Sequence, residues 1–112
     1  MDRLNNIKET CEQLKEAMNS ILLNKGYSLK DSQYHEESFG SRFFIWINKT
    51  KKHCYRLIWD GRDSWFVLEE SPYLGNPDKV AWADVVIVPF DSNVDNPKYR
   101  LEITSDIIDE IR

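Results

Sequence analysis

Glycine and histidine are scarce in this sequence, which has four glycines and two histidines among 112 residues. Phosphate-binding loops need closely spaced glycines, and neither GxGxxG nor GxxxxGK[ST] occurs. No GxSxG motif presents a serine as a nucleophile. The sequence therefore lacks the signature loops of nucleotide-binding and hydrolytic enzymes. We expect a protein without a cofactor, and more a binding protein than an enzyme.

Cysteine is equally scarce, and Cys11 and Cys54 are the two present. Both lie in apolar patterns without CxxC spacing, and free cysteine is among the most buried residue types. We expect two buried thiols, with a single structural disulfide as the open alternative. The closely spaced cysteines of small secreted domains are missing.

Long apolar runs are also missing, since none approaches the roughly 18 residues of a membrane span. No charged-then-apolar leader precedes the first predicted helix. We therefore expect a cytoplasmic protein that does not contact a membrane. The net charge of −4 disfavours a nucleic-acid partner. The one basic cluster, at 49–53, lies at the opposite end of the predicted hairpin from Arg42 and Arg62, so the cations do not form one continuous surface.

Among the features present, an amphipathic helix over residues 3–25 is the clearest. Apolar residues recur at spacings of three and four. Asp2 is the predicted N-cap of this helix, and Gly26 is predicted to end it. The stripe consists of Leu4, Ile7, Cys11, Leu14, Met18 and Ile21. The same positions form three heptads, so a weak helix-mediated homodimer is the alternative to a monomer whose helix packs on its own sheet.

Three strands rich in aromatic residues follow at 43–47, 55–59 and 65–68, with turns at 48–52 and 60–63. If Asn48 faces His53 and Asp60 faces Asp63, alternate residues gather on two apolar faces. One face then holds Phe44, Trp46, Tyr55, Leu57, Trp59, Phe66 and Leu68, and the other holds Phe43, Ile45, Ile47, Cys54, Ile58, Trp65 and Val67. Arg56 shares the second face and lies close enough to Glu69 for an ion pair.

The remaining segments give weaker signals. Tyr27 and Leu29 could start an edge strand, but residues 30–38 are polar and lack a clear period, so residues 27–41 are predicted to be mostly loop. Pro72, Gly75 and Pro77 interrupt regular structure over 71–83. The β-branched run at 84–90 predicts another strand. The alternation of Tyr99, Leu101 and Ile103 predicts a one-sided strand, followed by a short helix capped by Ser105.

The elements together predict a single α+β domain over residues 1–112. In it a long N-terminal helix packs on an antiparallel sheet of four to five strands, with the meander 41–70 at its centre and a short C-terminal helix. The 71–97 region or the terminal helix is expected to cover the second face. If that cover is incomplete, the exposed aromatic surface points to a partner.

Clusters of polar residues do not organise a catalytic or metal site. Adjacent residues in His35-Glu36-Glu37 point in different directions and cannot readily ligate one ion. Asp60 and Asp63 suit a hairpin turn for backbone reasons alone. No catalytic and no metal residue is predicted.

The second turn carries the predicted partner-binding residues Trp59, Arg62, Asp63 and Trp65. Tryptophan and arginine are enriched at interface hot spots, and a tight turn holds its flanking side chains in place. We therefore hypothesise a non-catalytic protein-interaction module, such as an inhibitor, immunity or chaperone-type accessory protein, whose partner is another protein. In outline, the helix, meander and closing helix resemble several small accessory folds, including secretion-chaperone and toxin-immunity proteins, and no motif selects among them.

A second hypothesis is a small-ligand-binding or enzymatic domain. Its site would lie between the sheet and the 71–97 loops, because binding residues concentrate on loops over rigid scaffolds. Tyr73, Asp84 and His35 are the polar side chains expected to converge there.

Overall fold

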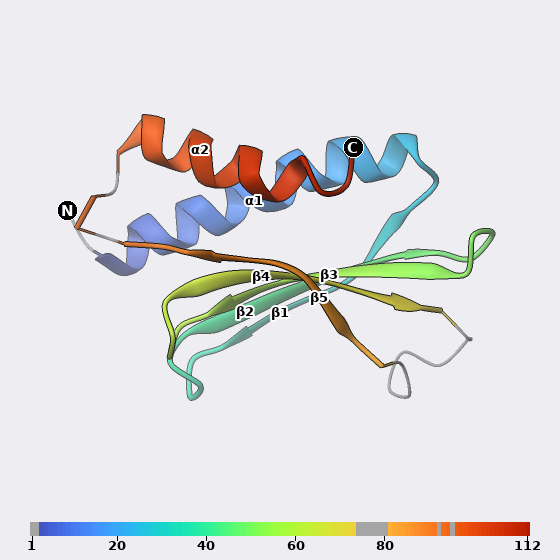
Figure 1. Ribbon diagram of the computed structural model, residues 1–112. Coiled ribbons are helices and arrows are strands. Elements are labelled where there is room, and N and C mark those ends of the chain that lie inside the picture. Colours follow the sequence, from blue (N-terminus) through green and yellow to red (C-terminus); the bar gives the residue numbers. More distant parts are fainter. Residues whose placement is uncertain (1–2, 74–80, 92, 95) are drawn as a thin grey trace.

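The computed structural model describes residues 3–73, 81–91, 93–94 and 96–112, with side chains from residue 7 onward. The elements are α1 (Arg3–Asn24), β1 (Ser28–His35), β2 (Ser41–Asn48), β3 (His53–Asp60), β4 (Trp65–Pro72), β5 (Ala83–Pro89) and α2 (Pro97–Ile108). The five strands form one antiparallel sheet in chain order, and both helices pack on the same face of it (Figure 1). The predicted α+β fold is thereby confirmed.

The N-terminal helix ends where the sequence indicates. Its apolar stripe is fully buried at Cys11, Leu14 and Met18. Gly26 has a φ of 89°, the left-handed backbone that glycine adopts without steric cost. The predicted cap Asp2 lies outside the described residues. Neither of the two helices described is long and apolar enough to cross a membrane.

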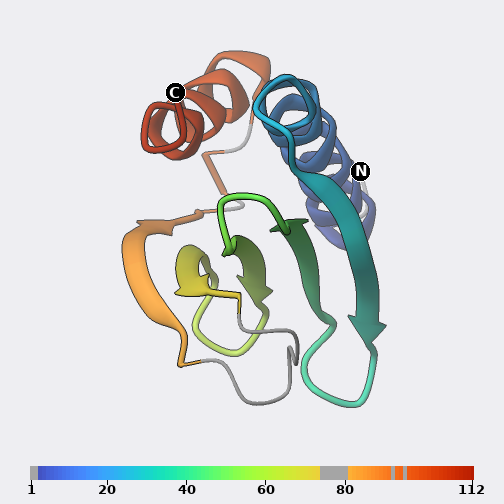
Figure 2. The same cartoon turned by 90° about the vertical axis from the view of Figure 1, so that its right-hand side faces the viewer.

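The core lies between the helices and one face of the sheet. Trp46 and Leu57 from the central strands are at most 1% exposed, as is Ile107 of α2. Figure 2 shows the two helices side by side above the sheet, and the Lys25 ammonium group donates to the carbonyl of Ile111 at 2.6 Å, which ties their C-terminal ends together. The apolar stripe of α1 therefore packs against the sheet and α2 of the same chain, the arrangement expected for a monomer.

The predicted register of the meander is correct at the turn between β2 and β3 and is shifted at the turn between β3 and β4. Asn48 faces His53 as predicted. Asp60 faces Trp65 instead of Asp63, so the second connection is a four-residue turn in which Ser64 adopts a φ of 55°. A shift of two residues preserves which side chains share a face. The two predicted faces are therefore observed, and Arg56 lies directly opposite Glu69.

The prediction of a loop over residues 27–41 is wrong, because residues 28–35 form β1. This strand is an edge strand, and most of its side chains are exposed. An edge strand with a polar sequence shows no apolar alternation, and its pairing with β2 supplies the structure that propensity does not.

The prediction of a strand at Tyr99–Ile103 with a cap at Ser105 is also wrong. Residues 97–108 form one helix, capped by Asn96, whose side chain accepts a hydrogen bond from the Tyr99 amide at 2.9 Å. Pro97 occupies the first turn, where its missing N–H costs nothing. The Asn96-Pro97 pair is thus a helix start signal.

Of the two segments expected to cover the second face of the sheet, the terminal helix lies beside α1 on the other face, whereas Trp82 of the 71–97 region lies against Arg56. We call the sheet surface away from the helices the open face. On this face Phe43, Ile45, Ile58 and Trp65 are partly exposed and Ile87 is 44% exposed, whereas Ile47, Cys54 and Val67 are buried. Within the described chain, the Trp82 ring is the clearest covering group, with the Arg56 guanidinium 4.3 Å from its centre.

Candidate functional site

A pocket of about 290 Å³ opens at the end of the sheet where the turns 36–40 and 61–64 meet. We call it the Arg42 pocket. Its lining among the described residues is Ile7, Tyr34, Phe39, Gly40, Arg42, Trp59, Gly61 and Ser64. The lining therefore comes from α1, from the β1–β2 hairpin and from the turn between β3 and β4, which are far apart in the sequence.

Arg42 is the one charged residue in that lining. Its side chain extends from β2 on the helix-facing side, opposite Trp59, and is partly buried. The Nε atom of Arg42 is buried and has no hydrogen-bond partner. A buried donor without a partner costs free energy, about 1–3 kcal/mol in typical cases. No ion pair joins this guanidinium to a carboxylate of the described residues.

Two exposed aromatic rings flank this arginine. The Arg42 guanidinium lies 4.3 Å from the centre of the Tyr34 ring, a cation–π arrangement, and Tyr34 is 52% exposed. Phe39 is 69% exposed. Its φ of 61° lies in the left-handed region, where a bulky L-residue is an outlier. Phe39 thus combines an exposed apolar ring with a strained backbone.

Close backbone packing holds the two turns together. A Cβ atom at Gly61 would overlap the carbonyl oxygen of Phe39, so only glycine fits at this point. The Gly61 amide donates to the hydroxyl of Ser41 at 3.0 Å. The Asp60 carboxylate accepts from the amides of Arg62 and Asp63 at 3.0 and 3.1 Å. These contacts fix the rim of the pocket.

The structure separates the four predicted partner-binding residues. Trp59 is 3% exposed and packs against Phe66 with ring centres 4.8 Å apart, so it forms the inner wall of the pocket. Arg62 and Asp63 are exposed at the turn beside it. Trp65 lies on the open face, on the opposite side of the sheet. The second turn does border a pocket, but the two tryptophans cannot contact one ligand.

Sequence reasoning missed Tyr34, Phe39 and Arg42. All three belong to the β1–β2 hairpin, whose first strand was interpreted as loop. Tyr34 lies directly opposite Arg42 in the observed register. The Phe39-Gly40 pair, next to the Ser41–Asn48 strand, was the available signal for a hairpin turn with a residue in a left-handed conformation.

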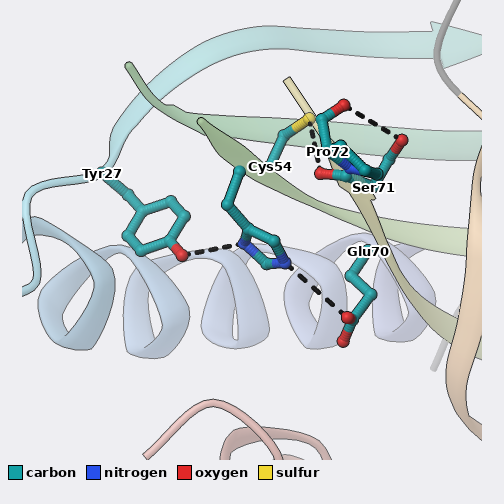
Figure 3. A network of polar contacts seen from close by, with 6 residues as sticks. Tyr27, Cys54, Glu70, Ser71 and Pro72 are labelled. Atoms are coloured by element: carbon teal, nitrogen blue, oxygen red, sulfur yellow. Dashed lines mark hydrogen bonds and ion pairs between the residues drawn. The ribbon is translucent and has the colours of Figure 1, made fainter. Parts of the chain in front are cut away.

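A polar network at the other end of the sheet joins Tyr27, His53 and Glu70. The Tyr27 hydroxyl lies 2.8 Å from Nδ1 of His53, and Nε2 of His53 lies 3.7 Å from a Glu70 oxygen. Figure 3 shows Tyr27 and Glu70 on opposite sides of the imidazole. Burial, more than the nearby Tyr55, raises the pKa of Tyr27 to about 12. A phenol that keeps its proton is a poor base, and the network serves to join β3 to the chain after α1.

The cysteines are free and buried, which confirms the prediction of buried thiols. Burial raises the pKa of Cys11 to about 12, against the lowering effect of the Arg42 charge, and burial also raises the pKa of Cys54. Cys54 donates to the Ser71 carbonyl at 3.4 Å. Such thiols are weak nucleophiles.

The polar residues proposed for a ligand site do not converge. His35 ends β1 beside Ser41, whereas Tyr73 follows β4 beside Lys52 at the opposite end of the strands, and Asp84 lies on β5 opposite Glu69. A strand of this length spans about 23 Å at roughly 3.3 Å per residue. In the part of the chain that the structure describes, no group of three or more His, Cys, Asp or Glu side chains is placed to hold a metal ion.

A second hollow, of about 280 Å³, lies on the open face. The Arg56 guanidinium at its floor pairs with the Glu69 carboxylate through Nε and Nη2, both at 2.7 Å. This confirms the predicted ion pair. Phe43, Ile45 and Trp82 form apolar walls. Lys30 and Asp31 also line this hollow. The Arg56 charge is neutralised within the chain, whereas no carboxylate of the described residues pairs with Arg42.

No protein-family model matches the chain, and comparison with curated proteins and with solved structures found no similar protein.

Proposed function

We propose that this protein is a non-catalytic protein-interaction module of the inhibitor, immunity or chaperone-type accessory class, and that the Arg42 pocket contacts its protein partner. The observation that carries the proposal is Phe39, a largely exposed ring on a strained backbone, next to the unpaired Arg42. A strained backbone and a buried donor without a partner each cost folding free energy. Strained residues that persist in a rigid setting are characteristic of recognition sites.

The chemistry of the surroundings supports binding over catalysis. Exposed aromatic and arginine side chains are typical of interface hot spots, and a rigid ring loses little conformational entropy on binding. Tyr34, Phe39 and Arg42 supply such groups on one hairpin. Arg62 and Asp63 extend the same surface, which retains part of the partner-binding cluster proposed from sequence.

The accompanying proposals follow from composition and packing. A protein with a net charge of −4 and thiols kept reduced suits the cytoplasm. The apolar stripe of α1 is used inside the chain, which favours a monomer over a helix-mediated homodimer.

The test is affinity capture with matched variants. A partner retained by the wild-type protein should be lost by Phe39→Ala, which removes the exposed ring. The control is Leu101→Ala, because Leu101 is 61% exposed on α2, away from the pocket. A partner retained equally by both variants would count against the Arg42 pocket as the contact surface. Arg62→Ala tests the outer part of the surface in the same way.

A small-ligand-binding or enzymatic domain is the second candidate, and the hollow on the open face favours it. Trp82, from the 71–97 region, lies over this hollow and stacks on Arg56, which suits a flat apolar ligand. A thermal-shift screen of metabolites and metal ions tests this candidate. A stabilising compound should lose its effect in Trp82→Ala and keep it in Phe39→Ala. A screen without any shift would remove this candidate.

A further inference from the structure

We propose that the Arg42 pocket binds a carboxylate group of the partner protein, with the Arg42 guanidinium as its counter-ion. The inference rests on the proposed protein-interaction function and names the chemistry that this surface recognises. No other basic side chain lines the pocket among the described residues, so it suits a single negative charge.

Comparison with the other partly buried arginines supports this assignment. Arg56 pairs with Glu69 at 2.7 Å, and Arg100 pairs with Glu9 at 3.3 Å. Arg42 is partly buried as well, but no carboxylate among the described residues pairs with it. A desolvated cation without a counter-ion is costly, and an incoming carboxylate removes that cost. Among the partly buried arginines that the structure describes, Arg42 is thus the one without a carboxylate partner.

The geometry around Arg42 suits a carboxylate. Tyr34 covers one face of the guanidinium plane at 4.3 Å and restricts its orientation. An arginine held by stacking keeps its N–H donors along the edge, the arrangement that pairs with two carboxylate oxygens. The Nε donor is itself buried, so the terminal Nη groups of Arg42 are the donors that an incoming carboxylate would meet.

The aromatic rim and the overall charge select against other anions. A polyphosphate or nucleic acid needs several cations and is repelled by a protein with a net charge of −4. The exposed rings of Tyr34 and Phe39 can pack against the carbon atoms next to a carboxylate. The pocket volume of about 290 Å³ accommodates an acidic side chain or a chain terminus together with a neighbouring apolar group.

The experiment is an NMR titration of the ¹⁵N-labelled full chain with small carboxylates. N-acetylglutamate α-amide offers a side-chain carboxylate, and N-acetylalanine offers a terminal one. N-acetylglutamine α-amide is the neutral control, and sodium chloride keeps the ionic strength equal. We expect binding with a dissociation constant on the order of millimolar, seen at the Arg42 Nε–H and the Phe39 and Gly61 amides. The stronger of the two carboxylate probes identifies the source of the group.

Matched arginine variants complete the test. Arg42→Gln should weaken carboxylate binding about tenfold or more, as loss of a charge-assisted hydrogen bond predicts. Arg42→Lys keeps the charge and guards against a folding defect, and it should bind more weakly than wild type. Arg112→Gln, at an exposed arginine outside the pocket lining, should bind as wild type does. An equal response to the neutral probe, or equal binding by all variants, would overturn the inference.

The two proposals can fail separately. If a partner is captured through Phe39 but capture survives Arg42→Gln, the carboxylate assignment fails and the interaction function stands. If carboxylates bind at Arg42 but no partner depends on Phe39, the proposed function fails instead.

Discussion

Gly61 packs directly against the backbone of Phe39, so closely that a Cβ at position 61 would overlap the Phe39 carbonyl oxygen. This contact joins the turn between β1 and β2 to the turn between β3 and β4. The overlapping atom belongs to the backbone and cannot rotate away. The rim of the Arg42 pocket therefore depends on one missing methyl group.

Gly61→Ala should separate the two turns and lower the free energy of unfolding by about 1–3 kcal/mol, the usual range for overpacking. Urea denaturation measures the change. Asp63→Ala in the same turn is the control, since its exposed side chain should contribute less than about 0.5 kcal/mol. Equal stability of the two variants would contradict the contact.

Phe39→Gly should leave the free energy of unfolding unchanged or raise it by up to about 1 kcal/mol. Glycine relieves the left-handed strain at φ 61°, and its extra freedom in the unfolded chain offsets part of that gain. Phe90→Ala is the contrasting variant, because Phe90 is 4% exposed against Phe66 and its loss should cost about 3–5 kcal/mol. A large loss of stability in Phe39→Gly would show that Phe39 supports the fold.

Asn96→Ala should destabilise the protein by about 1 kcal/mol, because it removes the side-chain acceptor at the start of α2. Ser105→Ala should change stability by less than about 0.5 kcal/mol, since Ser105 is an exposed residue inside the helix. Thermal unfolding of both variants measures the difference. A larger loss of stability in Ser105→Ala than in Asn96→Ala would favour Ser105, the cap predicted from sequence.

Alkaline pH should weaken the fold through Tyr27. Its pKa is about 12 in the folded chain, against 10.0 for an ordinary tyrosine. The folded state therefore keeps a proton that the unfolded state releases, and the resulting stability is present below pH 10 and lost as pH rises to about 12. Tyr27→Phe removes the hydrogen bond to His53, at a cost of about 1 kcal/mol near neutral pH.

The same variant should also flatten the fall in stability over that range, and urea denaturation at a series of pH values measures both effects. Cys11, with its raised pKa, contributes a parallel loss that the variant leaves in place. An unchanged slope in Tyr27→Phe would remove Tyr27 as a source of the alkaline loss.

The parts of the fold that burial dictates could be predicted from sequence. The stripe of α1 and the two faces of β2, β3 and β4 follow from side-chain periodicity, because each face must be apolar to be covered. The predicted partner of Asp60 was wrong by two residues. Because side chains alternate between the faces with a period of two, the predicted faces were still correct. The Arg56–Glu69 pair followed from the same alternation.

Two elements that depend on context could not be read in this way. The β1 strand is polar and gains its structure from pairing with β2, so its sequence carries no strand period. In α2, Tyr99, Leu101 and Ile103 imitate a strand, yet Leu101 is exposed and Ile103 is buried. The Asn96 cap outweighs that short alternation.

The candidate site was only half predictable for the same reason. Trp59 and the turn after it were identified, whereas Arg42 and Phe39 required knowledge of the first hairpin. Trp65 was misplaced relative to Trp59 because flanking a turn does not decide which face a side chain takes.

The order of the strands in the sheet repeats their order in the chain, and this has a consequence for assembly. Each strand pairs with the strand that follows it in the chain, so the sheet can form as the chain is synthesised. The two helices, by contrast, come from opposite ends of the sequence. Until α2 is made, the surface around Phe66 and Phe90 is only partly covered. We therefore expect a nascent chain that stops before residue 97 to bind chaperones, and a chain that extends through α2 to release them.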